Sequence, residues 1–345
     1  MTNAKYAFMS AYLKGAEAKI VTSEHIDRVS KTPNIQDVLE VIKDTDVGRY
    51  LEEAVIKTFD DSDRYLWKYF SQCLERLRGL KLVPADILKV LDAYIVKYDV
   101  LNIKAALQGI ATGKKASMIP VGIIDGRGLL DELSQAEDGG AIIKVLVECK
   151  LGAYAPIVEE YVAGEAKSKF LSEAKLDREY YTNLLTMPKG IPDGSLLTKA
   201  FSLMIDMANL QLVNRAIIEG IGSEADEFVI GGGYMISDKV AKDLIAHKLA
   251  DVPGALKGTQ YQSIAEEVVA SYSRTKSVTA VEETIDKHKF RLLREMLSPR
   301  VLTPLVIAWY LIVKEIEIRN LRLVLKATFD NIPVEEIKDY LVFAS

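Results

Sequence analysis

The chain has 345 residues, of which 49% are hydrophobic and 27% are charged, the balance of an ordinary globular protein. Its 44 lysine and arginine residues stand against 49 aspartate and glutamate residues, which gives a net charge of −5. This mildly acidic balance excludes a chain that is basic overall, as nucleic-acid-binding domains usually are.

Helix signals dominate the chain from one end to the other. Pro84 opens a segment, Ile87–Ile110, in which apolar residues recur at three and four positions. The same periodicity returns over Leu196–Glu219 and Thr303–Thr328, and Pro333 opens a last short segment. Because no stretch alternates between apolar and polar residues as a half-buried strand does, the sequence predicts an all-α fold.

Glycine clusters between the long segments predict loops, at Gly126–Gly128, Gly139–Gly140 and Gly231–Gly233. They are too short for flexible linkers, so no tethered second domain is expected. The most apolar stretch, Val301–Val313, is shorter than the roughly 20 residues of a bilayer-spanning helix, and Pro304 interrupts it. The sequence therefore predicts no membrane span.

Two short patterns recur along the chain. The first is Asp, a basic residue, any two residues and then an aromatic residue. It occurs as Asp63 with Trp67, Asp177 with Tyr181, and Asp286 with Phe290. The starts of these three sites are about 110 residues apart, and no other site in the chain matches.

The second pattern is an acid, Asn three positions later, and Lys, Gln or Arg two positions after that. It occurs as Asp99, Asn102 and Lys104; as Asp206, Asn209 and Gln211; and as Glu317, Asn320 and Arg322. The period is again about 110 residues, as expected of an internal repeat.

Three copies of this length fill the chain, with approximate bounds 1–118, 119–225 and 226–345. The period is too long for tetratricopeptide or armadillo repeats. In each copy the spacing of the two patterns fits one helix, a turn and the body of a second helix, which predicts an antiparallel helix pair. The sequence thus favours one compact body of three pseudo-symmetric helical lobes.

The asparagines are predicted to stabilise helix packing. The acid and the Asn three positions later share one helix face, and a helix-interior Asn lowers helix propensity, so its repetition indicates a polar contact between crossing helices. The Asp and the aromatic of the first pattern also share one side of a helix. Lys104, Gln211 and Arg322 point away from the asparagines and could face solvent, a neighbouring lobe, a central opening or a partner.

No motif predicts catalysis, a metal or a cofactor. Cys73 and Cys149 are too far apart in sequence for a Cys-x-x-Cys zinc site, and so few cysteines favour a reducing compartment. Gly109–Lys115 lacks the spacing of a phosphate-binding loop. Asp60–Asp63 resembles the Asp-rich magnesium motif of all-α prenyl transferases, but Arg64 replaces its last acid, which favours a solvated helix start.

The C-terminal run Lys314–Ala327 is similar to the signature of one family. Its Glu-Ile-Arg-Asn-Leu-Arg core, followed by a short loop and an amphipathic helix at Pro333–Leu341, resembles the C subunit of A-type and V-type rotary ATPases, whose eukaryotic counterpart is the d subunit. The segment Asp99–Lys104 resembles the first-repeat Asn motif of the family, whereas Gln211 departs from its basic pattern. The resemblance covers nearly the full chain.

The resemblance implies a funnel-shaped, three-lobed body with no catalytic residues and no cofactor. Family members lie at the cytoplasmic face of the membrane, on the ring of proteolipid subunits, and receive the central stalk, which consists of the D and F subunits. The implied function is a rotor coupling that transmits torque for ATP-coupled proton or sodium transport. No nucleic acid is expected as a partner.

Two other functions stay open at this point. A helical-repeat scaffold would bind a soluble partner and have an extended shape. An all-α enzyme would show magnesium-dependent turnover that substitution of Asp60 or Asp61 abolishes.

Overall fold

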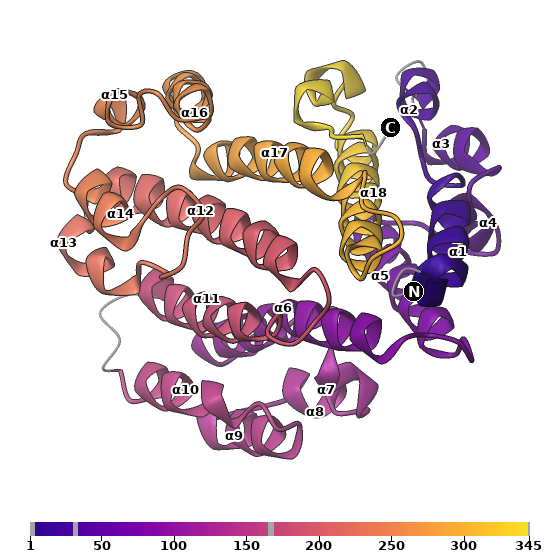
Figure 1. Ribbon diagram of the computed structural model, residues 1–345, viewed down its shortest axis with the longest axis horizontal. Helices are drawn as coiled ribbons and strands as arrows, with labels where there is room; N and C mark the ends of the chain where they lie inside the picture. Colours follow the sequence, from indigo (N-terminus) through magenta and orange to yellow (C-terminus); the bar gives the residue numbers. More distant parts are fainter. Residues whose placement is uncertain (1–3, 30–33, 165–168, 344–345) are drawn as a thin grey trace. The chain divides into compact units, whose positions relative to one another are not determined.

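The computed structural model describes residues 4–29, 34–164 and 169–343. Every regular element within these ranges is a helix and none is a strand, which confirms the predicted all-α fold (Figure 1). The three longest predicted segments are confirmed as helices: α6 spans Ala85–Thr112, α12 spans Gly194–Glu219 and α18 spans Leu305–Phe329.

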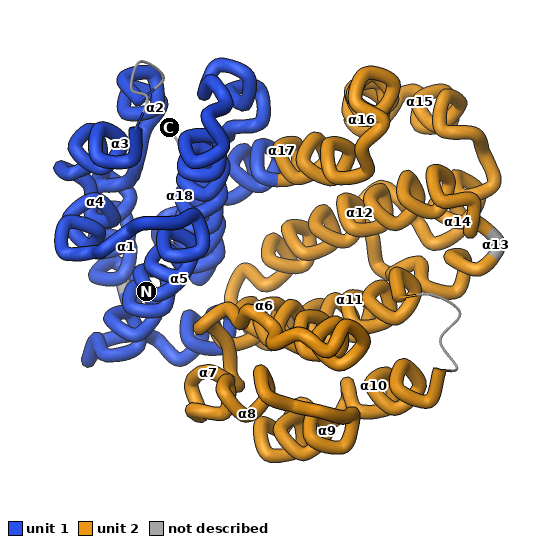
Figure 2. Tube along the Cα trace, turned by 180° about the vertical axis from the view of Figure 1, so that it is seen from behind, with its two compact units in different colours: residues 1–91, 290–345 blue, residues 92–289 orange. Residues whose placement is uncertain are grey.

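The chain divides into two compact units (Figure 2). Unit 1 consists of residues 1–91 and 290–345, and unit 2 of residues 92–289. Both ends of the chain therefore belong to unit 1. The two boundaries fall inside α6 and inside α17 (Val278–Leu297), so this division does not follow the three predicted copies, whose bounds stay a prediction.

Unit 1 is built around α18, of which every residue in 305–318 is buried. A helix that is apolar and buried on all sides is the core of its domain rather than a cover for one face. Helices α1 (Ala7–Glu17), α3 (Ile35–Ile42) and α5 (Phe59–Arg78) pack against α18. The other elements of this unit are α2 (Ser23–Val29), α4 (Asp46–Leu51) and the 3-10 turns η1 (Ala4–Tyr6), η5 (Val334–Glu336) and η6 (Lys338–Tyr340).

Unit 2 has α12 as its central helix, with α11 (Lys169–Thr186) and α14 (Asp238–Ile245) packed against it. Of the helices described, α12 is the one long and apolar enough to cross a bilayer, but 72% of its most apolar window is buried, as in a core helix. The shorter elements are α7 (Ile123–Gly126), α8 (Leu130–Ser134), α9 (Gly139–Glu148), η2 (Gly152–Tyr154), α10 (Ala155–Val162), α13 (Gly222–Ala225), η3 (Asp226–Phe228), η4 (Leu249–Asp251), α15 (Val252–Ala255) and α16 (Gln262–Thr275).

In unit 2, α11 packs against α12, and both lie in the predicted middle copy. In unit 1, α5 of the first copy packs against α18 of the last copy. Helices that are far apart along the chain thus share one core.

Two local predictions are wrong. Gly139 and Gly140 begin α9 instead of forming a loop, because the Asp138 side chain accepts the Ala141 N–H at 2.8 Å and caps the helix. The segment Pro333–Leu341 forms 3-10 turns instead of an amphipathic α-helix. The Tyr340 carbonyl, at the end of this segment, accepts from the Arg319 side chain of α18 and not from an N–H group of a continuing helix.

Candidate interface site

Each of the three repeated asparagines forms two hydrogen bonds with one residue of an irregular segment. The Asn side chain bonds to both the N–H and the C=O group of that residue. The Asn Nδ2 donates to the carbonyl oxygen, and the Asn Oδ1 accepts from the N–H of the same residue. The pairs are Asn102 with Ile119, Asn209 with Ile230, and Asn320 with Val342. In the first two pairs every N–O distance is 2.8 or 2.9 Å.

The asparagines therefore do not make the helix-to-helix contact expected from the sequence. All three are at most 2% exposed. A buried segment without helix or sheet partners leaves its own N–H and C=O groups to be satisfied, and an Asn side chain supplies one donor and one acceptor for them. This need explains why Asn is used in a helix interior that would otherwise disfavour it.

The acid of each triplet binds further main-chain N–H groups. Asp99 accepts from Ile123 and Ile124 at 2.8 and 2.9 Å, and Asp206 accepts from Met235 and Ile236 at 2.7 and 3.1 Å. Glu317 accepts from Val21 at 3.0 Å, a residue near the start of the chain. In the first two triplets, the acid and the Asn thus bind residues of the segment that follows their helix.

Glycines beside these N–H groups leave room for the two buried aspartates. A Cβ on Gly122 would lie 2.3 Å from Asp99 Oδ1, and a Cβ on Gly233 would lie 2.2 Å from Asp206 Oδ1. Gly122 also has a φ of +127°, a conformation that other L-residues rarely adopt. Gly122 and Gly233 are therefore required by the two aspartates that their segments cover.

Burial changes the acidity of both aspartates. It raises the pKa of Asp99 to about 7, because the carboxylate loses hydration and its two main-chain N–H donors offset only part of that loss. Burial also raises the pKa of Asp206, and the hydrogen bond from Tyr261 Oη, 2.6 Å away, acts in the opposite direction.

The raised pKa of Asp99 predicts a pH dependence of stability. An unfolded Asp titrates near about pH 4, so between about pH 4 and 7 the folded chain binds more protons at this site, and its stability falls as the pH rises, by up to about 1.4 kcal/mol per pH unit. Asp99→Asn removes this titration. We expect urea unfolding from pH 5 to 8 to show a steeper loss for the wild type than for Asp99→Asn.

The control for this titration is Asp131→Asn, which changes an exposed carboxylate of the same unit. It should leave the slope of stability against pH as in the wild type. Parallel pH profiles for the wild type and Asp99→Asn would contradict the assignment to Asp99.

The acid of the last copy is the one paired with a buried cation. Lys314 Nζ donates to Glu317 Oε2 at 2.8 Å and to Tyr69 Oη at 2.7 Å, and the two charged side chains are each 1% exposed. Burial raises the pKa of Tyr69 well above its ordinary value, so the phenol is neutral beside them. Lys314 was not predicted from the sequence, although its place three positions before Glu317 on one helix was a usable signal.

The last residue of each triplet contacts the Asp that opens the first pattern of another copy. Lys104 Nζ lies 2.6 Å from Asp177 Oδ1, Gln211 Nε2 donates to Asp286 Oδ1 at 3.0 Å, and Arg322 Nε forms an ion pair with Asp63. In terms of the predicted copies, the order is first to second, second to third, and third to first. Each of these side chains thus pairs with an Asp of the first pattern.

Lys289 supplies the positive charge that Gln211 lacks. Its Nζ lies 2.6 Å from Asp286 Oδ1, on the same helix and one turn later. The equivalent positions of the other two copies hold Leu66 and Tyr180. The middle contact therefore keeps a cation on its carboxylate although its triplet ends in an amide.

The aromatics of the first pattern have less uniform surroundings. The guanidinium of Arg322 lies 5.4 Å from the centre of the Trp67 ring, so Asp63 and Trp67 together bind that cation. The Phe290 ring lies 6.0 Å from the guanidinium of Arg319 instead.

A hollow of about 460 Å³ lies inside unit 2, where several of the motif residues meet. Its lining includes Lys104, Asp177, Tyr181, Gln211, Asp286 and Lys289. Arg215, Glu173 and Glu282 add further charges of both signs. The hollow therefore has paired charges set among apolar side chains such as Leu101, Phe170 and Phe228.

Lys104→Ala is expected to lower the free energy of unfolding by less than about 1 kcal/mol, because its partner Asp177 is 42% exposed and water screens the pair. Urea unfolding with circular dichroism measures the change. A loss above about 2 kcal/mol would show that the pair is a structural lock rather than a surface contact.

The two motifs considered for catalysis have structural roles in helices. Asp61 accepts the Thr58 N–H at 3.1 Å, and the Thr58 hydroxyl accepts the Asp61 N–H at 3.2 Å, which makes a capping box at the start of α5. Gly109 belongs to the last turns of α6. Within residues 4–29, 34–164 and 169–343, no group of three His, Cys, Asp or Glu side chains is placed to hold a metal ion.

Comparisons with known proteins cover almost the whole chain. Residues 9–340 match the family model described as ATP synthase (C/AC39) subunit. The chain is similar to the C subunit of the A-type ATP synthase of Methanocaldococcus jannaschii, with 25% identity over 98% of this chain and 86% of the relative. It is also similar to the proteins of that name from Methanothermobacter thermautotrophicus (22% identity, 93% of this chain and 83% of the relative) and Methanosphaera stadtmanae (22%, 98% and 88%).

Proposed function

The chain belongs to the ATP synthase (C/AC39) subunit family, as the C subunit of an A-type rotary ATP synthase, and on this premise we propose that it is a non-catalytic rotor coupling. It links the central stalk, made of the D and F subunits, to the proteolipid ring at the cytoplasmic face of the membrane. It transmits torque for ATP-coupled transport of protons or sodium ions.

The cyclic order of the three inter-copy contacts is the observation that carries this proposal. Lys104 contacts Asp177, Gln211 contacts Asp286, and Arg322 contacts Asp63, so each copy is joined to one other and the last returns to the first. This order supports three pseudo-symmetric lobes in a funnel-shaped body. A part that carries torque needs each copy to be tied to another, and this order provides one such contact for each predicted copy.

The charged side chains that line the hollow of unit 2 are a second support. A body of three lobes cannot match every contact on a proteolipid ring that has a different number of subunits. Adaptable polar groups tolerate such a mismatch. Arg322 itself bonds to Asp63 and lies over Trp67, so we do not assign it to a partner surface.

Co-purification tests the proposal. A tagged chain should carry the proteolipid ring and the D and F subunits out of detergent-solubilised membranes and should have no ATPase activity on its own. Recovery with soluble proteins alone would favour the helical scaffold instead. Magnesium-dependent turnover that Asp60→Asn abolishes would favour an enzyme.

A further inference from the structure

One part of the surface of unit 1 presents large apolar side chains to solvent. Phe8, in the first turn of α1, is 47% exposed, and Leu82, in the connection from α5 to α6, is 68% exposed. The two line one hollow of about 590 Å³, together with Val83 and Pro84. Tyr12 continues this surface along α1, because its ring stacks on that of Phe8 with 6.5 Å between the ring centres. Exposed apolar groups that adjoin in this way mark an interaction surface, whereas single ones do not.

A second connection of the same unit adds to this surface. Val301 and Leu302, between α17 and α18, are exposed. The Ser10 hydroxyl donates to the Val301 carbonyl, which holds this connection against α1. We call Phe8, Leu82, Val301 and Leu302 the α1 patch. They are four of the six large apolar side chains that are exposed in the described part of unit 1, so these groups gather around the first turns of one helix.

The α1 patch has cations directly beside it. Lys81 and Arg300 each precede the apolar residues of the two connections, and both are exposed. Within the residues that the structure describes, neither of these side chains forms an ion pair. Asp86 is the acid that lines the hollow, and Lys5 Nζ lies 2.6 Å from its Oδ2. Because the whole chain has a net charge of −5, this excess of positive charge is a local feature.

Exposed apolar side chains with cations next to them have the chemistry that fits an anionic lipid surface. The apolar groups enter the boundary between head groups and acyl chains, and lysine and arginine side chains bind lipid phosphate groups. The same surface repels the acidic remainder of the chain, which favours an approach through the α1 patch.

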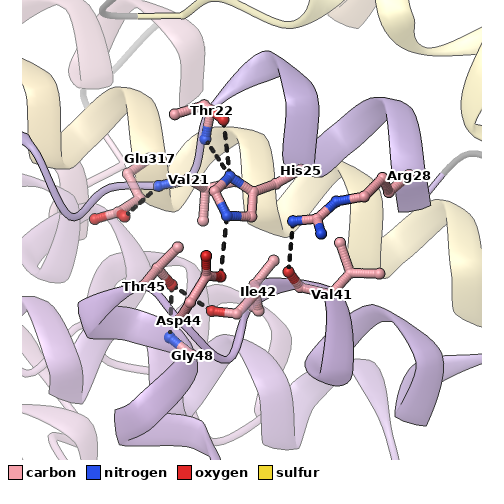
Figure 3. A network of polar contacts seen from close by, with 10 residues as sticks. All are labelled: Val21, Thr22, His25, Arg28, Val41, Ile42, Asp44, Thr45, Gly48 and Glu317. Atoms are coloured by element: carbon pink, nitrogen blue, oxygen red, sulfur yellow. Dashed lines mark hydrogen bonds and ion pairs between the residues drawn. The ribbon is translucent and has the colours of Figure 1, made fainter.

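The opposite end of α1 leads into a polar network instead (Figure 3). Beyond that end, Glu317 accepts the Val21 N–H at 3.0 Å. His25 Nδ1 accepts the Thr22 N–H at 3.1 Å, and His25 Nε2 lies 3.1 Å from Asp44 Oδ1. The polar groups joined there are bonded within the chain. The segment after α1 is thus tied to its own unit, while the first turn of the helix presents the α1 patch to solvent.

We propose that the α1 patch binds the surface of an anionic lipid bilayer. Phe8 and Leu82 enter the head-group region, and Lys81 and Arg300 contact lipid phosphates. This inference rests on the proposed function for the membrane at which the chain works, and it adds lipid to the proteins named there as a partner. The contact itself is a property of the isolated chain.

The test is co-flotation of the full chain with lipid vesicles. Vesicles of phosphatidylcholine with about one-third phosphatidylglycerol should bind the chain at least about ten-fold more tightly than vesicles of phosphatidylcholine alone, because each cation near an anionic surface strengthens binding about five-fold. Phe8→Ser combined with Leu82→Ser should weaken binding to the anionic vesicles at least about ten-fold. The matched control is Val55→Ser combined with Ile332→Ser, which changes two exposed apolar side chains of unit 1 outside the patch and should bind as the wild type.

A second pair of variants tests the charges. Lys81→Glu combined with Arg300→Glu should weaken binding to the anionic vesicles at least about ten-fold. Lys114→Glu combined with Lys115→Glu makes the same change in net charge at two exposed lysines of unit 2. This control should weaken binding by less than about three-fold, because charges farther than a Debye length from the bilayer are screened.

Binding of the wild type that is equal for the two kinds of vesicle, or absent for both, would overturn the lipid assignment. Wild-type affinity in the Phe8→Ser, Leu82→Ser variant would overturn it too. A dimeric wild type that this variant converts to monomers would show that the patch joins two copies of the chain. Circular dichroism checks the fold of each variant, and if the serine pair loses native helicity, the charge pair decides. The vesicles contain no ring or stalk, so a failure to bind them would leave the co-purification test of the proposed function unaffected.

Discussion

Replacing Glu317 with alanine is expected to lower the free energy of unfolding by about 3–5 kcal/mol. The change leaves the Lys314 ammonium, 1% exposed, without its carboxylate, and leaves the Val21 N–H without an acceptor. A buried charge that loses its partner keeps the full penalty of its lost hydration. Urea unfolding followed by circular dichroism at 222 nm measures the effect.

Lys14 and Glu17 provide a matched control. They have the same order and the same three-residue spacing, with 2.6 Å between Nζ and Oε2, but their side chains are 35% and 21% exposed. Glu17→Ala should therefore change the stability by at most about 1 kcal/mol. The double variant Lys314→Met with Glu317→Leu should be more stable than Glu317→Ala, since no unpaired charge is left. Equal losses for Glu17→Ala and Glu317→Ala would refute the role assigned to burial.

Leucine in place of Asn102 or of Asn209 is expected to lower the free energy of unfolding by about 2–5 kcal/mol, because each change leaves one buried N–H and one buried C=O without a partner. For Asn320→Leu we expect a loss of the same size, because the buried Val342 N–H and C=O are likewise left without the Asn320 side chain. The three variants thus test one kind of contact at three places in the chain.

Thermal and urea unfolding of the three variants, side by side, measure these losses. Circular dichroism before unfolding checks that each variant has native helicity. Unchanged melting in all three would show that these asparagines do not stabilise the fold. A loss confined to one of the three would show that the contacts are not equivalent.

The fold class could be predicted from the sequence because the apolar periodicity of α6, α12 and α18 is long and uninterrupted. Two local predictions of secondary structure failed for different reasons. The Gly139–Gly140 pair looked like a loop, but the cap from Asp138 outweighs the low helix propensity of glycine. The last segment was expected to be helical from its proline start and from the family resemblance, whereas the side chain of Arg319, distant in sequence, binds its Tyr340 carbonyl.

The repeated residues could be found from the sequence, but their contacts could not. Periodicity identifies Asn209 and Asp206, yet it does not indicate that both bind main-chain groups of the loop that follows. The pairing of Arg322 with Asp63 joins residues 259 positions apart, which no local pattern encodes. The i, i+3 spacing of Asp286 and Lys289 was a usable signal, but that Gln211 contacts the same carboxylate could not be predicted.

The composition of unit 1 from residues 1–91 and 290–345 has a consequence for how the protein is made. On a ribosome the first helices emerge early, but α18, the core against which α1 and α5 pack, is translated only after all of unit 2. The apolar faces of α1 and α5 therefore stay without their partner helix while all of unit 2 is synthesised. Contacts between segments so distant in sequence form slowly. Nascent chains stalled before residue 305 should therefore be the species that chaperones bind and proteases cut near the N-terminus.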